Sequence, residues 1–173
     1  GVLNSTTKIV IEAMRRGKSM QEGIEEARRL GVTEADAAYD IDGWDSAAKT
    51  AALANVLMDA RTTPQQVDTR GIGRLTPERL ADLAAKHKTV CLVSRARQTE
   101  AGVRLRVRAE VVDESDILAS VHRTSNLILF HTDLMGTVGT VSISPGVGQT
   151  AYGVFSDLVD VWKTIRSGSA DGA

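Results

Sequence analysis

The chain has 173 residues, of which 42% are hydrophobic and 25% charged, and this composition indicates a folded globular protein and excludes a largely disordered one. It has 21 basic and 22 acidic residues and no long basic run, so it lacks the electrostatic footprint of a nucleic-acid-binding protein. Its apolar runs are far shorter than the roughly 20 residues that a membrane-spanning helix needs. We therefore expect a cytoplasmic protein that acts on a small molecule, with neither nucleic acid nor a membrane as a partner.

The first residue and the rare residue types limit the possibilities further. Gly1 stands where a natural chain would begin with methionine, so we expect a domain of a longer protein. The single cysteine, Cys91, lies in an apolar run and is expected in the core, with neither a disulfide nor a nucleophilic role. His87, His122 and His131 do not have the spacing of metal ligands, so we expect no metal site.

Helical signals occupy the first half of the chain. Capping residues followed by apolar periods predict helices over residues 4–14, 19–31, 44–59 and 76–87. The clearest signals are the capping box formed by Ser19 and Glu22 and the proline at the first helical position, Pro77. Residues 34–42 are acidic and lack an apolar period, so we expect a loop there.

Strand signals follow. Alternating apolar and polar residues predict strands with one solvent-exposed face over residues 89–94 and 103–111, and residues 126–131 and 137–142 are expected to form two more strands. A turn at residues 133–136 joins the last two strands, and residues 150–166 form a final helix. Helices followed by strands indicate an α+β fold, with a mixed, largely antiparallel sheet and helices packed on one face in two layers.

An acidic segment, residues 34–49, holds the strongest candidates for chemistry. It places carboxylates at Glu34, Asp36, Asp40, Asp42 and Asp45 ahead of Lys49. Asp45 and Lys49 are four residues apart on a predicted helix, which on spacing alone fits an exposed ion pair. A calcium loop is a second alternative, although the spacing misses the calcium-binding pattern. In a third interpretation, the carboxylates bind a substrate ammonium group and the lysine moves a proton to or from an alcohol or carbonyl oxygen.

A second candidate segment, Pro145-Gly146-Val147-Gly148, leads into the predicted C-terminal helix. Glycines let a backbone approach a ligand closely, and the N–H groups at a helix start attract anions or a polar ring. The third glycine of the dinucleotide-binding fingerprint is absent and no βαβ unit follows. An ordinary helix entry therefore remains an alternative.

Four stretches match one protein family in that family's order. They are GVLNSTT (1–7), LGVTEAD (30–36) with DIDGWDSAAK (40–49), Gly71-Ile72, and GVGQTAYGVFSDL (146–158). They resemble G-[IV]-[LI]-N-G-T-T, L-G-Y-x-E-x-D-P with D-x-x-G-x-D-x-x-x-K, G-I, and a G-x-G…T-A…D-L ending. The chain thus resembles the catalytic domain of homoserine dehydrogenases over essentially its whole length, and residues 34–49 are the most specific part.

This resemblance implies an oxidoreductase that interconverts L-homoserine and L-aspartate 4-semialdehyde with NAD(P), in threonine and methionine biosynthesis. Lys49 would be the catalytic lysine that exchanges a proton with the substrate oxygen, and Asp45 would position the substrate and support that transfer. Glu34 and Asp40 would bind the amino-acid end of the substrate, and Thr6 would line the same pocket.

The resemblance also implies a cofactor and partners. Gly146 and Gly148 would approach the nicotinamide of NAD or NADP, which is bound mostly by an N-terminal Rossmann domain of the same parent chain. Without that domain the chain should not convert substrate. Residues 1–150 would form the catalytic domain, and residues 151–173 a helix that packs back on the nucleotide-binding domain. A homodimer would form through the sheet, for which the open face of residues 103–111 is a candidate unless it is simply solvated.

Some residues depart from the family pattern. Ser5 replaces a usual glycine beside the substrate, and Val32 replaces a usual tyrosine. Ala35 and Ala37 stand at common proline positions, and Ser144 at a frequent glycine position. The alternatives are therefore a paralogous NAD(P)-dependent oxidoreductase for a related hydroxy or semialdehyde amino acid, and a non-catalytic dimerisation or binding module.

Overall fold

The computed structural model describes residues 1–33 and 36–168. Its internal contacts divide the chain into two units, residues 1–143 and residues 144–173, each of which is described by itself.

Three of the helices in the first unit begin at predicted capping residues. The helices of this unit are α1 (Ser5–Arg15), α2 (Met20–Arg29), α3 (Ala38–Ile41), α4 (Trp44–Met58) and α5 (Pro77–Ala84), with short 3-10 helices η1 (Pro64–Gln66) and η2 (Ile117–Ala119). Asn4 caps α1, Ser19 and Glu22 form the capping box of α2, and Thr76 caps α5. Each of these caps uses an oxygen within one turn of the helix start, which is why the sequence predicts them.

Helix α3 was not predicted, because a loop was expected over residues 34–42. The side chain of Asp36 accepts a hydrogen bond from the N–H of Ala38 at 2.9 Å, and this contact starts the single turn of α3. Four residues are too few to show an apolar period, so the sequence pattern could not reveal the helix.

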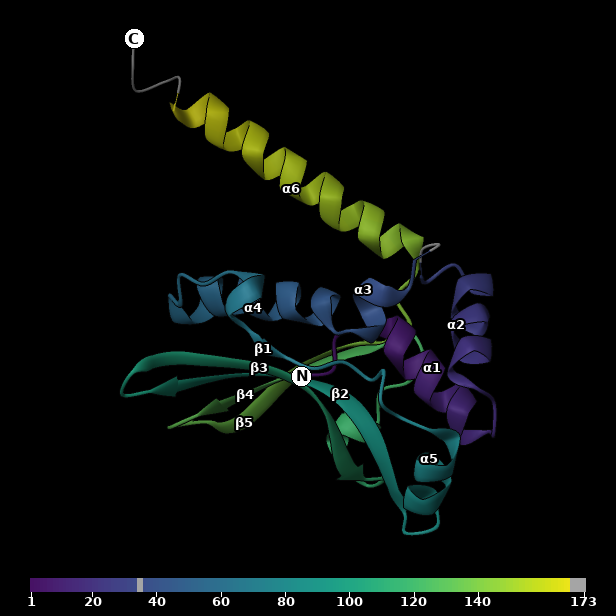
Figure 1. Ribbon diagram of the computed structural model, residues 1–173. Coiled ribbons are helices and arrows are strands. Elements are labelled where there is room, and N and C mark those ends of the chain that lie inside the picture. Colours follow the sequence, from purple (N-terminus) through teal and green to yellow (C-terminus); the bar gives the residue numbers. More distant parts are fainter. Residues whose placement is uncertain (34–35, 169–173) are drawn as a thin grey trace. The chain divides into compact units, whose positions relative to one another are not determined.

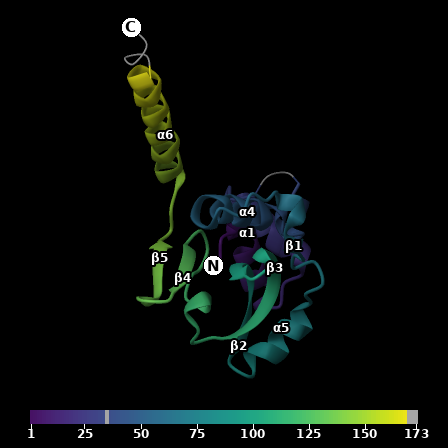
Figure 2. The same ribbon diagram turned by 90° about the vertical axis from the view of Figure 1, so that its left-hand side faces the viewer.

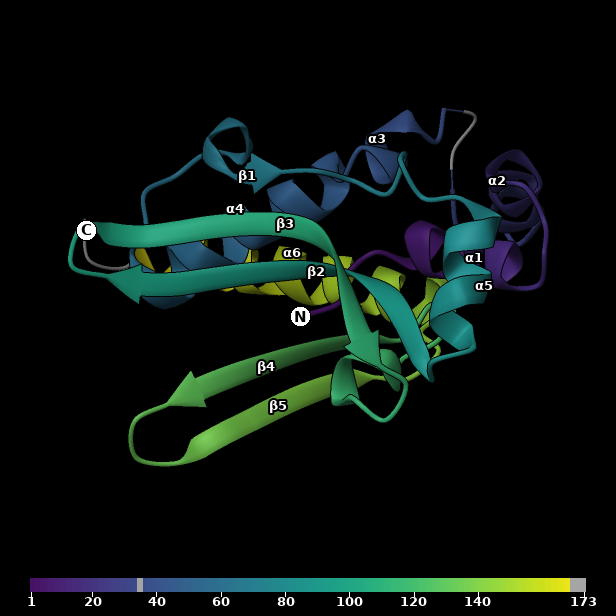
Figure 3. The ribbon, with the colours of Figure 1, turned by 60° about the horizontal axis from the view of Figure 1, so that its bottom comes forward.

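The strands form two separate sheets. Strands β1 (Asp68–Thr69), β2 (Lys88–Thr99) and β3 (Gly102–Asp113) lie in the order β1-β3-β2, and β4 (Asn126–Thr132) pairs with β5 (Gly136–Ser142). β1 runs parallel to β3, whereas the two hairpins are antiparallel (Figure 3). A bridge between Val2 and Leu127 ties the N-terminal segment to β4. The predicted α+β class with a mixed, largely antiparallel arrangement is confirmed, although the short β1 and the division into two sheets were not predicted.

The first half of β2 is buried on both faces. Helix α4 lies along one face of the β2–β3 hairpin (Figure 1), and Val90 and Leu92 belong to the core cluster on that face. The alternate residues Cys91 and Val93 pack in a second cluster with Leu127 of β4. The prediction of one solvent-exposed face is therefore wrong for this half of β2, because β4 and η2 cover the face that the helices leave open.

β3 exposes one face over most of the predicted residues 103–111, and this face continues onto β2, which runs beyond the predicted residues 89–94 to Thr99. That face carries arginines, among them Arg95, Arg97, Arg104 and Arg106. Arg95 and Arg106 both pair with Glu110, at 2.6 and 2.9 Å. The open surface of the hairpin is thus basic and partly neutralised.

The second unit contains helix α6 (Val147–Gly168), which begins three residues before the predicted start (Figure 2). Its exposed apolar side chains include Val154, Leu158, Val161 and Ile165, which recur at the spacing of one helix face. Over the residues that the structure describes, no helix combines the length and apolar character needed to cross a membrane.

Candidate active site

Two carboxylates meet at the cap of α1. Asn4 is 3% exposed, and its Nδ2 donates to Asp40 Oδ1 at 2.5 Å and to Asp45 Oδ2 at 2.9 Å. Its Oδ1 accepts from the N–H of Thr7 at 2.8 Å, so both ends of the amide are fixed. Because one amide group binds both side chains, Asp40 of α3 and Asp45 of α4 converge.

Lys49 completes this Asp40–Asp45–Lys49 cluster from one turn further along α4. Its Nζ donates to Asp45 Oδ2 at 2.8 Å and to the carbonyl of Leu3 at 3.2 Å. The side chain of Lys49 is 50% exposed and that of Asp45 26%. The pair therefore differs from an ordinary exposed ion pair, because the same carboxylate oxygen also binds a buried amide. The lysine remains accessible to a ligand.

The charge of the cluster favours a ligand with a positive group. Two carboxylates and one ammonium leave one formal negative charge, and the hydroxyl of Thr33 donates to Asp40 Oδ2 at 2.9 Å. Asp45 lies in the first turn of α4, where the positive end of the helix dipole stabilises a carboxylate. Such a site attracts an ammonium group while offering a lysine proton to a nearby oxygen.

The structure brings together three of the predicted site residues, Asp40, Asp45 and Lys49, within the first unit. Glu34 lies outside the described residues. Thr6 is 1% exposed and donates to the carbonyl of Val32 at 3.2 Å, so its hydroxyl is already used within the protein. Gly146 and Gly148 belong to the second unit, at the start of α6.

Asn4 and Thr33 are the residues of this site that sequence reasoning missed. Asn4 was assigned only a capping role, although it lies in one of the matched stretches. Its contacts with Asp40 and Asp45 join residues 36 and 41 positions apart, and no local pattern reports such a separation.

A buried lysine lies one turn beyond the cap. Lys8 is 7% exposed, and its Nζ donates to the carbonyl of Ser125 at 2.6 Å. Burial is the main reason that the pKa of Lys8 is lowered to about 8, and the positive charge of Lys49 contributes to the same effect.

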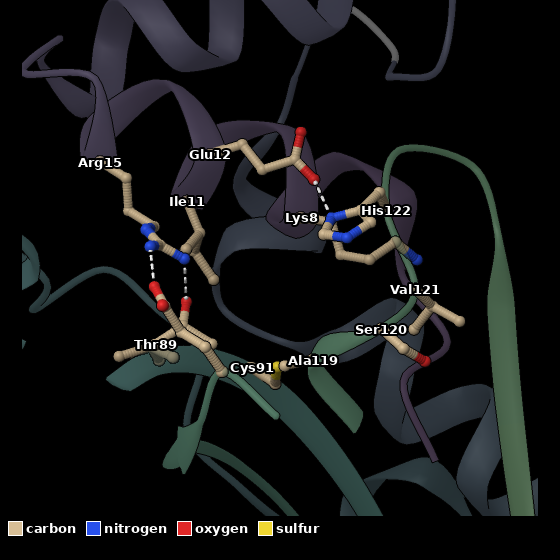
Figure 4. Close-up of a pocket in the computed structure, with 12 residues that line it drawn as sticks. Lys8, Ile11, Glu12, Arg15, Thr89, Cys91, Ala119, Ser120, Val121 and His122 are labelled. Carbon is tan, nitrogen blue, oxygen red and sulfur yellow. Dashed lines mark hydrogen bonds and ion pairs between the residues drawn. The ribbon is translucent and has the colours of Figure 1, made fainter. Parts of the chain in front are cut away.

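Lys8 also lines a cavity of about 320 Å³ between α1, β2 and the residues after η2 (Figure 4). The other acidic and basic side chains there lie in two pairs. Arg15 contacts Glu114, and His122 lies 3.2 Å from Glu12. This cavity is separate from the Asp40–Asp45–Lys49 cluster, since none of the three lines it.

The other candidate groups play structural parts. Cys91 is buried, as predicted, and burial raises the pKa of its thiol to about 11. In the described residues no group of three or more histidine, cysteine, aspartate or glutamate side chains is arranged to hold a metal ion.

Comparison with known proteins identifies the family. The homoserine dehydrogenase family profile matches residues 1–159. An NAD(+)-dependent homoserine dehydrogenase of Pseudomonas canavaninivorans is 32% identical over 167 residues, which is 95% of this chain and 47% of the relative. The homoserine dehydrogenase of Bacillus subtilis is 30% identical, over 97% of this chain and 39% of the relative.

Comparison with solved structures gives the same family. A Thiobacillus denitrificans homoserine dehydrogenase is 31% identical, with a TM-score of 0.81, over 91% of this chain and 37% of that chain. A Staphylococcus aureus homoserine dehydrogenase, solved at pH 7.0, is 25% identical, with a TM-score of 0.84, over 95% and 42% of the two chains. The chain thus spans less than half the length of these relatives, and on the profile that matches residues 1–159 it belongs to the homoserine dehydrogenase family.

Proposed function

We propose that this chain is the catalytic part of an NAD(P)-dependent homoserine dehydrogenase, which interconverts L-homoserine and L-aspartate 4-semialdehyde. The observation that carries the proposal is the double use of Asp45 Oδ2, which binds both the buried Asn4 amide and the accessible Lys49 ammonium. This arrangement fixes a proton-transferring group beside carboxylates, and both substrates carry an ammonium group and a reacting oxygen.

The carboxylates bind the amino-acid end of the substrate in this proposal. Asp40 is held by Asn4 and Thr33, so its position is set before the substrate arrives. Glu34 is proposed to join Asp40 in holding the ammonium, and Thr6 to support the same pocket through its bond to Val32. A pre-positioned carboxylate costs little reorganisation on binding.

Lys49 transfers the proton. In the oxidation direction its neutral amine accepts the hydroxyl proton of homoserine, and in the reduction direction its ammonium returns a proton to the carbonyl oxygen. Asp45 holds the amine at 2.8 Å and stabilises its protonated form as the transfer proceeds.

NAD or NADP would accept the hydride. A Cβ at Gly148 would meet no atom within 4 Å, and one at Gly146 would meet only a side-chain oxygen of Gln149 at 3.5 Å, so the backbone there is open to a ligand. We propose that both glycines approach the nicotinamide, and that most of the cofactor is bound by a Rossmann domain of the parent chain. The short span of this chain relative to its relatives supports that division.

Two surfaces are proposed to meet partners. The exposed apolar face of α6, with Val154, Leu158 and Ile165, would pack on the Rossmann domain. The open face of the β2–β3 hairpin, with Arg95 and Arg106, would contribute to a homodimer. Light scattering of the full-length protein should give the mass of a dimer.

A paralogous oxidoreductase is the second candidate, favoured by Ser5 and Val32. Ser5 is the first residue of α1, next to Asn4, and Val32 is half-buried against Thr6. Both positions differ from the family pattern beside the substrate pocket, where a change of side chain alters the shape that a substrate meets.

The test uses the full-length protein that contains this chain. We expect it to oxidise L-homoserine in preference to other hydroxy amino acids, and Lys49→Ala to lower kcat by about 10²-fold or more with little change in stability. Lys86→Ala, which changes an exposed lysine two residues beyond the end of α5, is the control. Faster turnover of another substrate would favour the paralogue, and no turnover of any would favour a binding module.

A further inference from the structure

Gly71 lies against the backbone that carries the site. A Cβ added at Gly71 would be 1.8 Å from the carbonyl oxygen of Ile41 and 2.6 Å from Asp42 Cα. Ile41 and Asp42 directly follow Asp40 and lead into α4. The φ of Gly71 is not among the positive values, so its backbone conformation does not itself require glycine. Space is the reason that no side chain fits here.

The segment that holds Gly71 is anchored to the sheet. Asp68 and Thr69 form β1 beside β3, and the N–H of Arg70 donates to the carbonyl of Val107 at 2.9 Å. On the other side of Gly71, the N–H of Ile72 donates to the carbonyl of Ile41 at 2.8 Å. Ile72 is fully buried. The sheet therefore supports the turn between α3 and α4 through a direct backbone contact.

The same support reaches the start of α4. A Cβ at Gly43 would lie 3.1 Å from Thr69 Cγ2 and 3.5 Å from Gly71 Cα, and Gly43 has a φ of +89°. Gly43 precedes the helix that carries Asp45 and Lys49. The contact at Gly71 thus bears on both halves of the cluster, with Asp40 on one side of the turn and Asp45 on the other.

We propose that Gly71 is a positioning residue, which sets the placement of Asp40 relative to Asn4 and Asp45 by allowing the turn at Ile41 and Asp42 to rest directly on the sheet-anchored segment. As a role in catalysis, this rests on the proposed function. Gly71-Ile72 was matched only as part of the family pattern, and the contact with the backbone of Ile41 and Asp42 explains why a residue without a side chain is needed there.

The size of the effect follows from the distances. Contacts closer than 3.0 Å are essentially never made by a real Cβ, so alanine at position 71 must move the Ile41 carbonyl away by at least about 1.2 Å. Such a movement would stretch the bond between Ile72 and Ile41 and carry Asp40 away from Asn4. Misplacement of a binding or catalytic group by about 1 Å costs roughly 10²-fold in rate.

Gly73 offers a matched control two residues away. A Cβ there would meet only Ile41 Cγ2 at 3.8 Å, an ordinary contact. In the full-length protein, Gly71→Ala should raise the KM for homoserine by about 10-fold or more and lower kcat/KM by about 10²-fold. The KM for NAD(P) should stay within about 2-fold, because the cofactor is proposed to bind mainly elsewhere. Gly73→Ala should leave the homoserine KM, kcat/KM and the NAD(P) KM unchanged.

Gly43→Ala is the second variant, in case Gly71→Ala does not fold. It disturbs the same turn through a milder contact with Thr69 and through its left-handed backbone, which a Cβ strains, and it should raise the homoserine KM several-fold. If Gly71→Ala folds, a homoserine KM equal to that of Gly73→Ala would overturn the proposal. If Gly71→Ala does not fold, an unchanged homoserine KM in Gly43→Ala would overturn it.

A crystal structure separates failure of this proposal from failure of the proposed function. A wild-type protein that does not oxidise homoserine would refute the function alone. The structure of the full-length Gly71→Ala protein, or of Gly43→Ala in its place, should then show Asn4 Nδ2 and Asp40 Oδ1 beyond hydrogen-bond distance. A retained separation of 2.5 Å would overturn the positioning role.

Discussion

Replacing Lys8 by methionine measures by how much the buried amine lowers the free energy of unfolding. Burial lowers the pKa of Lys8 from 10.5 to about 8, and one pKa unit corresponds to about 1.4 kcal/mol, so the charged form destabilises the folded chain by about 3 kcal/mol. Methionine fills a similar space without a charge, but the hydrogen bond to the Ser125 carbonyl is lost, which offsets about 1 kcal/mol. We expect Lys8→Met to be about 2 kcal/mol more stable than wild type near pH 7.

The pH dependence gives the sign of the effect. The unfolded chain keeps the Lys8 proton up to the ordinary pKa of 10.5, whereas the folded chain loses it near pH 8. Between these values the unfolded state binds more protons, so this group makes wild-type stability rise with pH. The advantage of Lys8→Met is therefore full below about pH 8 and shrinks as the pH rises toward 10.5.

Urea denaturation at about pH 7 and about pH 9.5 makes the comparison, with Lys86→Met as the exposed control. The advantage of Lys8→Met should fall by about 2 kcal/mol between the two pH values, and the control should match wild type at both. The reasoning is refuted if Lys8→Met is less stable than wild type near pH 7, or if its advantage is the same at both pH values.

Three further results are expected. In the full-length protein, Asn4→Ser keeps an oxygen for the α1 cap but loses the buried amide that binds both carboxylates, so stability should fall by about 2 kcal/mol and the homoserine KM should rise about 10-fold; an unchanged KM would contradict the bridging role. Cys91 should resist thiol reagents at about pH 8 in the folded chain and react in urea, because burial raises its pKa to about 11; rapid labelling of the folded chain would argue against burial. The hydrogen bond from Arg95 lowers the pKa of Glu110, so this carboxylate contributes stability above the ordinary value of 4.5 that is lost as the pH falls through the lowered folded pKa. Glu110→Gln should therefore flatten the acid limb of the stability curve, and an identical curve would show that the ion pair contributes nothing.

Most of the fold could be predicted because its signals are local. The caps of α1, α2 and α5 each depend on residues within one turn, and the β4–β5 hairpin depends on two alternating runs beside a turn. The two-residue strand β1 could not be predicted, because only its pairing with β3 defines it. The burial of Cys91 and Val93 on the second face of β2 depends on β4, which comes later in the chain.

The site was predictable only in part, because some of its contacts join residues that are far apart in the sequence. The spacing of Asp45 and Lys49 on one helix predicts their contact, and the structure contains it at 2.8 Å. Spacing could not show that Asp40 joins them, because Asn4 makes that connection from another helix. The space requirement at Gly71 is likewise invisible in the sequence, since it arises from a backbone distant along the chain.

The bridge made by Asn4 links ligand binding to local unfolding. The Asp45–Lys49 contact lies within one turn of α4 and persists wherever that helix forms, whereas the Asn4–Asp40 bond exists only when α1 is docked against α3. A transient opening of α1 would therefore leave the ion pair intact while dispersing the carboxylates. Affinity for a ligand at the cluster is then reduced by the fraction of molecules in which α1 is open, and a bound ligand slows hydrogen exchange in α1 as well as in α4.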